Sequence, residues 1–362
     1  IIEGQQMFFH NIWEYLTTDT AYSKIREFLY SFDENELDEE ASVKGPIVDG
    51  MQTYVDSVVV TTNELLYMLG SINDEDSTYT MILPTNKAWD AAYKRIAPYY
   101  TFYKNKVDKD SLEDLYTKRG IVGDLIFSHT VQKSMQDSLI STSLNVFDKP
   151  FDYILSDYTS MDDGYVCSNG NVFVVDSLRH APWDSWHTRL KVEGERTNGH
   201  EFTNCIAYRR NLSHSDSLYT KISKGAYLEA VPKSSGVSPS IEFSIWNTLA
   251  AAYEVKIVFL PQRIATDKSI GELPNHITVA VDYLDASGKS RKANLKTAKD
   301  SLHVDPTRID TVSAGIFEFP VATFGEEKSS TKITVKSAAS SRDKNKSRTF
   351  LVDCIILEPV KE

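Results

Sequence analysis

Hydrophobic and polar positions follow two different patterns, and the change between them divides the chain in two. In the first part, apolar residues recur at the three- and four-residue spacing of amphipathic helices, as over residues 9–16. In the second part, apolar and polar residues alternate over short runs, such as residues 241–245 and 253–259. We therefore expect an α+β domain over residues 1–188 and an antiparallel β-sandwich over residues 189–362.

Residues 79–90 predict a buried strand, a sharp corner and a capped helix. Pro84 follows the apolar run of the strand and ends it, because proline has no N–H to donate to a ladder. Thr85 and Asn86 carry side chains that cap helices. Helical spacing then continues over residues 87–96.

Two later segments belong to the same pattern. Residues 121–130 have helical spacing and contain His129, and Asn169-Gly170 is a hairpin turn signal before an apolar strand that ends at Asp176. In this order the three segments resemble the signature segments of fasciclin-like (FAS1) domains. The resemblance implies a fasciclin-like α+β fold and structural roles for the motif residues, which are Pro84, Thr85, Asn86, His129, Asn169, Gly170 and Asp176. Because Ser128 stands where the family usually has a Tyr, a structural role for His129 is favoured over an adhesive one.

Three other stretches of the first part carry weaker signals. Residues 33–50 are strongly polar, and we expect a solvated loop or insertion there. Residues 55–60 predict a strand and residues 63–69 a short helix. The aromatic cluster at residues 99–103 is either an exposed binding patch or the lid of a core, and the lid is favoured.

The strand rhythm of the second part resembles the galactose-binding-like jelly roll found in many carbohydrate-binding modules. The last strand, residues 350–358, has an Asp, alternating apolar residues and a closing Pro, as that fold commonly does. Trp246 is out of phase with the inward positions before it, so it faces away from the core. It either stacks on a sugar ring or covers a sheet edge or the contact with the first domain. Tyr208 and Tyr219 are further candidates for ligand contacts.

Charge and composition exclude several classes of function. The chain has 51 acidic and 39 basic residues, a net charge of −12, which disfavours binding to nucleic acid. Its three cysteines show no Cys-x-x-Cys spacing, so neither a zinc nor a redox motif is predicted. Jelly rolls of this kind often carry a structural calcium ion, but no Asp-rich loop is evident, and we predict no metal. No stretch of about 20 apolar residues predicts a transmembrane helix.

Catalytic motifs are absent from the sequence: it has no Gly-x-Ser-x-Gly, no His-Glu-x-x-His and no glycine-rich phosphate loop. We expect a non-enzymatic protein that uses no cofactor. Its expected role is adhesion, or the binding of a surface glycan or another surface protein. The pairing of the two domains resembles bacterial surface fasciclin-domain lipoproteins. This implies an extracytoplasmic location, at the cell surface or outer membrane, and a lipid anchor upstream of residue 1. The alternatives are a structural accessory subunit of a surface complex, or a hydrolase whose carboxylates meet only in the fold.

Overall fold

The computed structural model describes residues 9–128 and 164–361 and divides into two compact units. The first unit comprises Ile1–Ile96 and Tyr116–Trp186, and the second comprises Ala97–Leu115 and His187–Glu362. The division is thus not a single cut near residue 188, because the aromatic segment at residues 97–115 belongs to the second unit. Its backbone is bonded there: the Lys104 N–H donates to the Ala286 carbonyl at 3.0 Å, and the Ala250 N–H donates to the Tyr99 carbonyl at 2.8 Å.

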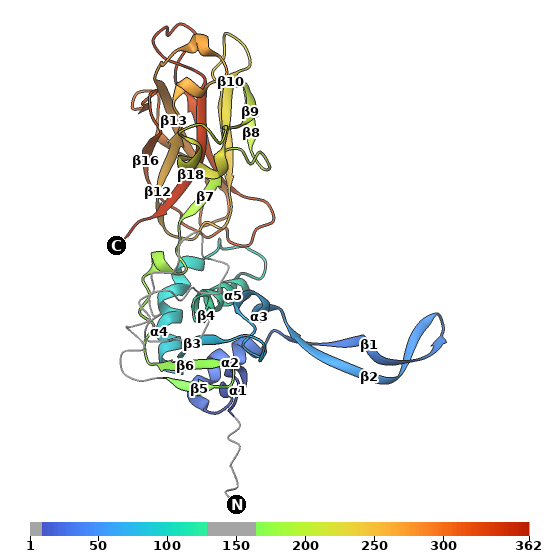
Figure 1. The fold of residues 1–362 in the computed structure, drawn as a ribbon. Coiled ribbons are helices and arrows are strands. Elements are labelled where there is room, and N and C mark those ends of the chain that lie inside the picture. The colour runs from blue at the N-terminus through green and yellow to red at the C-terminus, as the bar shows by residue number, and fades with distance from the viewer. Residues whose placement is uncertain (1–8, 129–163, 362) are drawn as a thin grey trace, which may run out of the picture. The chain divides into compact units, whose positions relative to one another are not determined.

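The first unit is built on a four-stranded mixed sheet in the order β4-β3-β6-β5 (Figure 1). The strand β3 pairs antiparallel with β4 and parallel with β6, and β6 pairs antiparallel with β5. The elements of this unit, in chain order, are α1 (Ile12–Tyr15), η1 (Thr20–Tyr22), α2 (Ser23–Tyr30), β1 (Asp33–Val48), β2 (Met51–Asn63), α3 (Glu64–Leu69), β3 (Tyr79–Pro84), α4 (Asn86–Ile96), β4 (Ile126–Ser128), β5 (Tyr165–Cys167), β6 (Gly170–Val175) and η4 (Pro182–Asp184). The helix α5 (Lys109–Val122) begins in residues assigned to the second unit and ends in residues assigned to the first.

Several predictions for this unit are confirmed. The strand and capped helix expected over residues 79–96 are β3 and α4, and the helix expected at residues 63–69 is α3. In α4, Ala88, Trp89, Ala92 and Ile96 form the buried stripe. The unit therefore has an α+β architecture, whereas its relationship to fasciclin-like domains stays a prediction.

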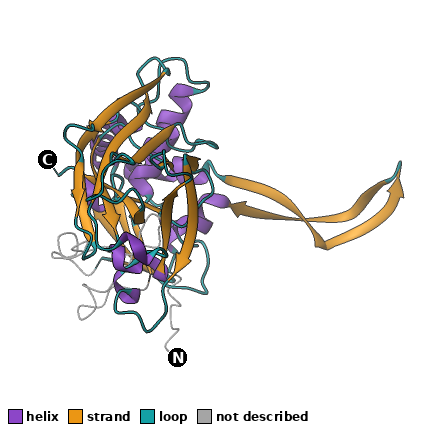
Figure 2. Ribbon diagram, turned by 90° about the horizontal axis from the view of Figure 1, so that it is seen from above, coloured by secondary structure: helices purple, strands orange, loops and turns teal. Residues whose placement is uncertain are grey.

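The polar stretch at residues 33–50 is not a loop, as we expected, but the strand β1. It pairs antiparallel with β2 to form a two-stranded ribbon that extends away from the rest of its unit (Figures 1 and 2). Asp49 and Gly50 close the ribbon, with φ of 51° and 79°, the left-handed conformation that a tight two-residue hairpin turn requires. The prediction was wrong because this strand is exposed to solvent and therefore has the polar composition that is typical of a loop.

The helix predicted over residues 121–130 is also partly wrong. The helix α5 runs through Gly120 and ends at Val122, and the chain then forms the strand β4. Pairing with β3 sets this conformation, since Met81 lies opposite Ile126 in the ladder. His129 lies outside the described residues.

The second unit is an antiparallel β-sandwich, as predicted. One sheet, here called the β12 sheet, has the order β16-β12-β18-β10-β9, with β7 paired to β18. The other, the β11 sheet, has the order β14-β13-β17-β11-β8, with β15 paired to β13. The strands are β7 (Leu190–Glu193), β8 (Glu201–Thr203), β9 (Cys205–Asn211), β10 (Ala226–Pro232), β11 (Ser240–Ile245), β12 (Ala252–Phe259), β13 (Asn275–Leu284), β14 (Ser290–Lys296), β15 (Leu302–Val304), β16 (Asp310–Glu318), β17 (Thr331–Ser337) and β18 (Phe350–Pro359).

Strands that follow one another in the chain alternate between the two sheets from β10 to β13 and again from β16 to β18, which is the connectivity of a jelly roll. Short helical turns lie in the connections of the unit: η2 (Ala97–Tyr100), η5 (Tyr219–Lys221), η6 (Ser223–Gly225), η7 (Gln262–Ile264) and η8 (Lys268–Ile270).

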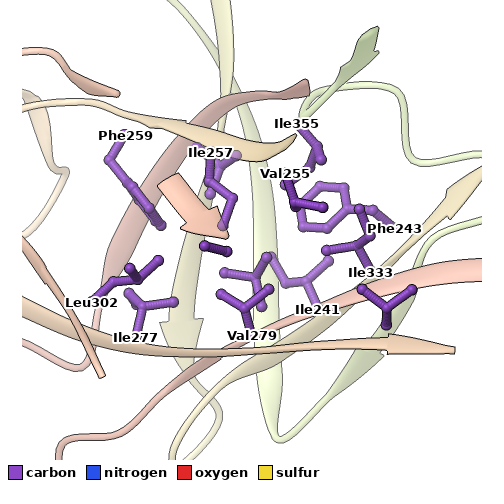
Figure 3. Close-up of a cluster of buried hydrophobic side chains, with 14 of the residues drawn as sticks. Ile241, Phe243, Val255, Ile257, Phe259, Ile277, Val279, Leu302, Ile333 and Ile355 are labelled. Carbon is purple, nitrogen blue, oxygen red and sulfur yellow. The ribbon is translucent and has the colours of Figure 1, made fainter. Parts of the chain in front are cut away.

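Inward side chains of both sheets meet in one hydrophobic core (Figure 3). Successive side chains of a strand point to opposite faces, so Phe243 is fully buried there while Glu242 beside it faces outward. Core residues include Ile241, Phe243, Val255, Ile257, Phe259, Ile277, Val279, Leu302, Ile333 and Ile355. In the aromatic cluster at residues 99–103, Tyr100 and Phe102 are buried, as the favoured alternative, the lid of a core, predicts.

Candidate functional site

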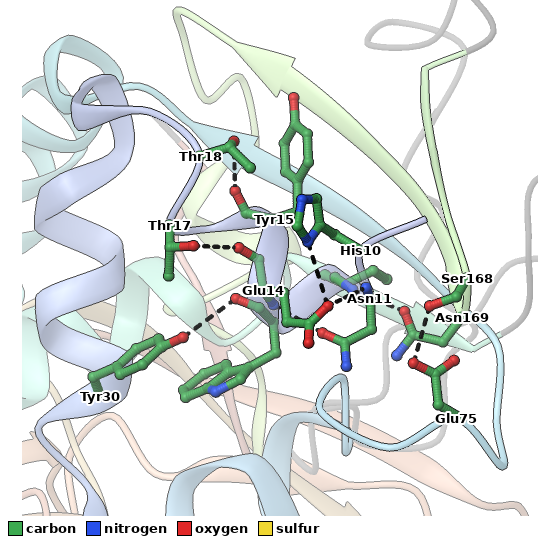
Figure 4. Close-up of polar contacts among 12 residues, drawn as sticks. His10, Asn11, Glu14, Tyr15, Thr17, Thr18, Tyr30, Glu75, Ser168 and Asn169 are labelled. Carbon is green, nitrogen blue, oxygen red and sulfur yellow. Dashed lines mark hydrogen bonds and ion pairs between the residues drawn. The ribbon is translucent and has the colours of Figure 1, made fainter. Parts of the chain in front are cut away.

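Asn169, which Figure 4 shows next to Ser168, is a residue of the fasciclin-like pattern and joins three segments of the first unit. Its side-chain oxygen accepts a hydrogen bond from the Ile12 N–H at 2.8 Å. Its side-chain nitrogen donates to the carbonyls of Ile72 at 2.8 Å and Asp74 at 2.9 Å. The amide is buried, and its oxygen and nitrogen both bond to backbone groups.

Gly170 begins the parallel pairing of β6 with β3, opposite Tyr79. Its φ of +150° favours glycine, and a Cβ added to it would lie 1.9 Å from the Tyr79 carbonyl oxygen. Only glycine therefore fits at this position.

The remaining described motif residues fasten the corner after β3. The Thr85 hydroxyl donates to a carboxylate oxygen of Asp176 at 3.0 Å and also accepts from the Ala88 N–H at 3.3 Å. The Asn86 side chain accepts from the Lys24 N–H at 3.0 Å, which ties α4 to α2. Pro84 ends β3 opposite Val175 of β6. These contacts fasten β3, β6 and the two helices to one another.

Trp246 follows the last residue of β11 and faces outward, as its phase in the sequence predicted. It is 37% exposed, whereas Ile245 beside it is fully buried. Its indole lies against Gly199, where any Cβ would come within 2.6 Å of Cη2 of the ring. Gly199 has a φ of +81°, a conformation that favours glycine. Glycine is therefore favoured here both by the backbone conformation and by the lack of space for a Cβ. The result is an aromatic face that is supported from behind and open to solvent.

A ladder of charged side chains continues from Trp246 across the outward face of the β11 sheet. Lys332 of β17 pairs with Glu201 of β8, and its Nζ lies 3.7 Å from a carboxylate oxygen of Glu242. Lys292 of β14 lies 3.2 Å from Asp282 of β13, which stands opposite Lys332 in the ladder. The hydrogen bond with Glu201 is the main cause of the raised pKa of Lys332. This arrangement could not be found in the sequence, since it depends on the register of five strands.

Tyr208 and Tyr219 do not join Trp246 in one site. Tyr208 is 40% exposed but lies on the outward face of the β12 sheet, opposite Glu229 of β10, with the Arg210 guanidinium 4.5 Å from its ring centroid. Tyr219 packs over Gly225, where a Cβ would be 2.3 Å from its ring. Tyr219 belongs to η5 and lies on neither sheet, so the three sequence candidates do not form one site.

A group of buried carboxyl side chains lies where β7 meets β18. Ser223 joins two of them: its N–H donates to Asp353 at 3.1 Å, and its hydroxyl donates to Glu193 at 2.6 Å. Burial, and secondarily the charge of Glu193, raises the pKa of Asp353 to about 6. Burial likewise raises the pKa of Glu195. Within the described residues, one carboxylate oxygen each of Glu193 and Glu195 is buried without a hydrogen-bond partner.

The described part of the chain contains no group of three or more His, Cys, Asp or Glu side chains that could hold a metal ion.

A hollow of about 380 Å³ lies in the first unit, between the end of β2 and the segment after α3. Among the residues that line it are Thr62, Tyr67, Asp74 and Glu75. Glu75 accepts a hydrogen bond from the Ser168 hydroxyl at 2.9 Å. Among the described helices, none is long and apolar enough to cross a membrane.

Comparison with known proteins gives similarity only at the level of structure. No protein-family model matches the sequence, and no curated protein matches it. Solved structures that resemble the chain include the CBM22-1 xylan-binding domain of Paenibacillus barcinonensis Xyn10C, at 13% identity and a TM-score of 0.30 over 48% of this chain and 94% of that one. Another is a family 35 carbohydrate-binding module from Clostridium thermocellum, at 10% identity and a TM-score of 0.27, covering 48% of this chain and 99% of that one. A third, CBM35 from Cellvibrio japonicus Abf62, has 10% identity and a TM-score of 0.25 over 47% of this chain and 92% of that one. At such identities and TM-scores these neighbours do not identify a ligand for this chain.

Proposed function

We propose that the second unit binds a glycan on the outward face of its β11 sheet. The observation that carries the proposal is Trp246, a large aromatic side chain that is exposed beside a continuous polar surface and held from behind by Gly199. An indole face stacks well on the C–H face of a sugar ring, because both surfaces are flat and apolar. The backbone of Gly199 limits the movement of the ring, so little conformational entropy is lost on binding.

The polar ladder suits a hydroxyl-rich ligand without net charge. The charges of Lys332, Glu201 and Glu242 are paired with one another, as are those of Lys292 and Asp282. A strongly charged ligand would have to break these pairs. Sugar hydroxyls instead can donate to the carboxylates and accept from the ammonium groups while the pairs persist. A neutral polysaccharide is therefore the ligand class that we propose.

The role that we propose for the protein is binding without catalysis, in an extracytoplasmic setting where polysaccharides are met. The buried carboxyls of Glu193 and Asp353 are bonded through Ser223, and neither lines the hollow described above. Adhesion, a fasciclin-like first domain and attachment by a lipid anchor belong to the same hypothesis. A second candidate function, docking within a larger complex, is favoured by the exposed β1–β2 ribbon.

The test is a glycan array followed by titration calorimetry of each hit, with wild-type protein, Trp246→Ala and Tyr208→Ala. Xylan is included because one of the similar structures is a xylan-binding domain. Tyr208 is the matched control, since it is equally exposed but lies on the other sheet. We expect Trp246→Ala to weaken binding by about tenfold or more, or ~1.4 kcal/mol, while Tyr208→Ala binds like the wild type.

Each other outcome changes the conclusion. Loss of binding in Tyr208→Ala alone would move the site to the β12 sheet. Equal binding by both variants would keep the glycan and reject the site. Silence of the wild-type protein across neutral and acidic glycans would reject the function. Thermal melting of each variant separates loss of the site from loss of the fold.

A further inference from the structure

The ribbon formed by β1 and β2 exposes many large apolar side chains to solvent. Two-stranded hairpins are only marginally stable in water unless one face is covered. Here large apolar residues are exposed along the whole ribbon, and they are Leu37, Val43, Ile47, Val48, Met51, Val55, Val58, Val59 and Val60. Both strands also leave their outer edges unpaired within the described structure. Such an element is typical of an interaction surface.

The ribbon is also the main source of the negative charge of the chain. It carries eight acidic residues and one lysine, a net charge of −7 out of −12 for the whole protein. The acidic residues are Asp33, Glu34, Glu36, Asp38, Glu39, Glu40, Asp49 and Asp56. A second copy of the chain would bring the same sign of charge to this surface, and like charges repel on close approach. A partner with basic residues is therefore favoured over self-association.

The register places acidic and apolar side chains together on one face of the ribbon. Residues directly opposite each other in an antiparallel pair share a face. Three such pairs, Glu34 with Thr62, Glu36 with Val60 and Asp38 with Val58, lie on the same side, here called the acidic–valine face. Val58 and Val60 are 39% and 45% exposed. Leu37 and Val59 form the next pair and point to the other side, where the Thr61 hydroxyl donates to Asn35 at 2.9 Å.

The acidic–valine face ends at the hollow of the first unit. Thr62 belongs to this face and lines the hollow together with Asp74 and Glu75, and Thr61 of the other face lines it too. The negative character of the face thus continues into a concave surface that can receive a lysine or arginine side chain. Tyr67, which lines the same hollow, is 74% exposed and adds an aromatic contact of the kind enriched in interfaces.

We propose that the acidic–valine face, with the hollow at its base, is a docking surface for a protein partner that presents apolar side chains flanked by lysine or arginine. The valines bury against the apolar side chains, and the acidic row of β1 pairs with the basic ones. This interaction is independent of glycan binding by the second unit. It predicts an interface that weakens as the salt concentration rises.

The test uses the full chain with a photoreactive p-benzoylphenylalanine at position 60, and the same group at position 59 as the matched control on the other face. After irradiation in the cells that produce the protein, adducts are identified by mass spectrometry. The identified partner is then purified and titrated against wild-type protein and two charge variants. One is Glu34→Gln/Glu36→Gln/Asp38→Asn, on the proposed face. The other, Glu39→Gln/Glu40→Gln/Asp49→Asn, removes the same charge from the ribbon elsewhere.

We expect one protein adduct that forms from position 60 and not from position 59. We also expect the first charge variant to bind the purified partner at least about tenfold more weakly than the second, and raised salt to weaken the wild-type complex. A pair of valine variants provides an uncharged check: Val58→Thr/Val60→Thr should weaken binding, and Leu37→Thr/Val59→Thr should not, because Thr keeps the strand propensity.

The proposal is overturned by an adduct between two copies of this chain, by equal adducts from both positions, or by no adduct above that of protein without the photoreactive group. Equal affinity of the two charge variants for the partner would overturn it as well. Circular dichroism of every variant shows whether the ribbon is still formed.

Discussion

The buried carboxyl of Asp353 should stabilise the β-sandwich at low pH, and this contribution should be lost as the pH rises from 4 to 7. Asp353 is 4% exposed, and burial is the main cause that raises its pKa from 3.8 to about 6. Between these two values the folded state holds a proton that the unfolded state has lost. The stabilisation is therefore complete below pH 4 and is lost as pH rises through about 6.

The magnitude follows from the two pKa values. The pKa of Asp353 in the folded state lies about two pKa units above its value in the unfolded state. At 1.36 kcal/mol per pKa unit, this difference corresponds to about 3 kcal/mol of folding free energy. The Glu195 carboxyl, whose pKa is also raised by burial, acts in the same direction. Some carboxyls nearer the surface act in the opposite direction. The hydrogen bond between Thr307 and Asp305 lowers the pKa of Asp305 to about 2, so this effect is confined to pH values below about 4. Buried histidines of the same unit act in the opposite direction within the window, because burial lowers the pKa of His187 to about 4 and also lowers that of His200. The contribution of Asp353 is therefore read from the difference between wild type and a variant that lacks this carboxyl.

The perturbation is Asp353→Asn, which keeps the shape of the side chain and removes its titration. Calorimetric unfolding of wild type and variant is followed from pH 4 to pH 7 in the presence of a chelator. The transition of the sandwich is identified as the one that Phe243→Ala lowers, since Phe243 is fully buried in its core. The melting temperature of Asp353→Asn should rise relative to wild type by about 6–12 °C across this range, at about 2–4 °C per kcal/mol.

Parallel curves for wild type and Asp353→Asn would refute the reasoning, because they would show that the carboxyl has the same protonation in the folded and unfolded states. A wild type that gains stability over the variant as pH rises would also refute it, since the charged form would then be the stabilised one. Asp282→Asn serves as the control. That carboxyl lies on the outward face of the sandwich, near Lys292.

Two predictions concern the first unit. Gly170→Ala should destabilise it by more than about 1 kcal/mol, because the added Cβ would lie 1.9 Å from the Tyr79 carbonyl oxygen and the backbone there has a positive φ; urea unfolding measures the loss, and an unchanged midpoint would contradict the argument. Asn169→Ala should cost about 2–4 kcal/mol, since it leaves the buried Ile12 N–H without its partner and removes one donor each from the Ile72 and Asp74 carbonyls. Hydrogen exchange should show faster opening of the amide of Ile12, and protection equal to wild type would show that these hydrogen bonds are dispensable.

The β-sandwich could be predicted because its strands are buried on one side. In β11, β12 and β13 the alternation of apolar and polar residues is a direct record of which side chains face the core. Trp246 was placed outward by the same phase. The ribbon of β1 and β2 could not be predicted in this way, since both of its faces meet solvent and its acidic strand has the composition of a loop.

The sequence by itself determined the elements whose cause is local: the capped corner after β3, the turn at Asn169-Gly170 and the alternation of the sandwich strands. Tertiary structure alone decided which distant residues meet. Lys332 and Glu201 are far apart in the chain and pair only through the register of two ladders. The pKa of Asp353 is raised only because the loop carrying Ser223 and the strand β7 cover its carboxyl. Periodicity reports which face of a strand is buried, but register and burial by remote segments depend on how all the strands pack together.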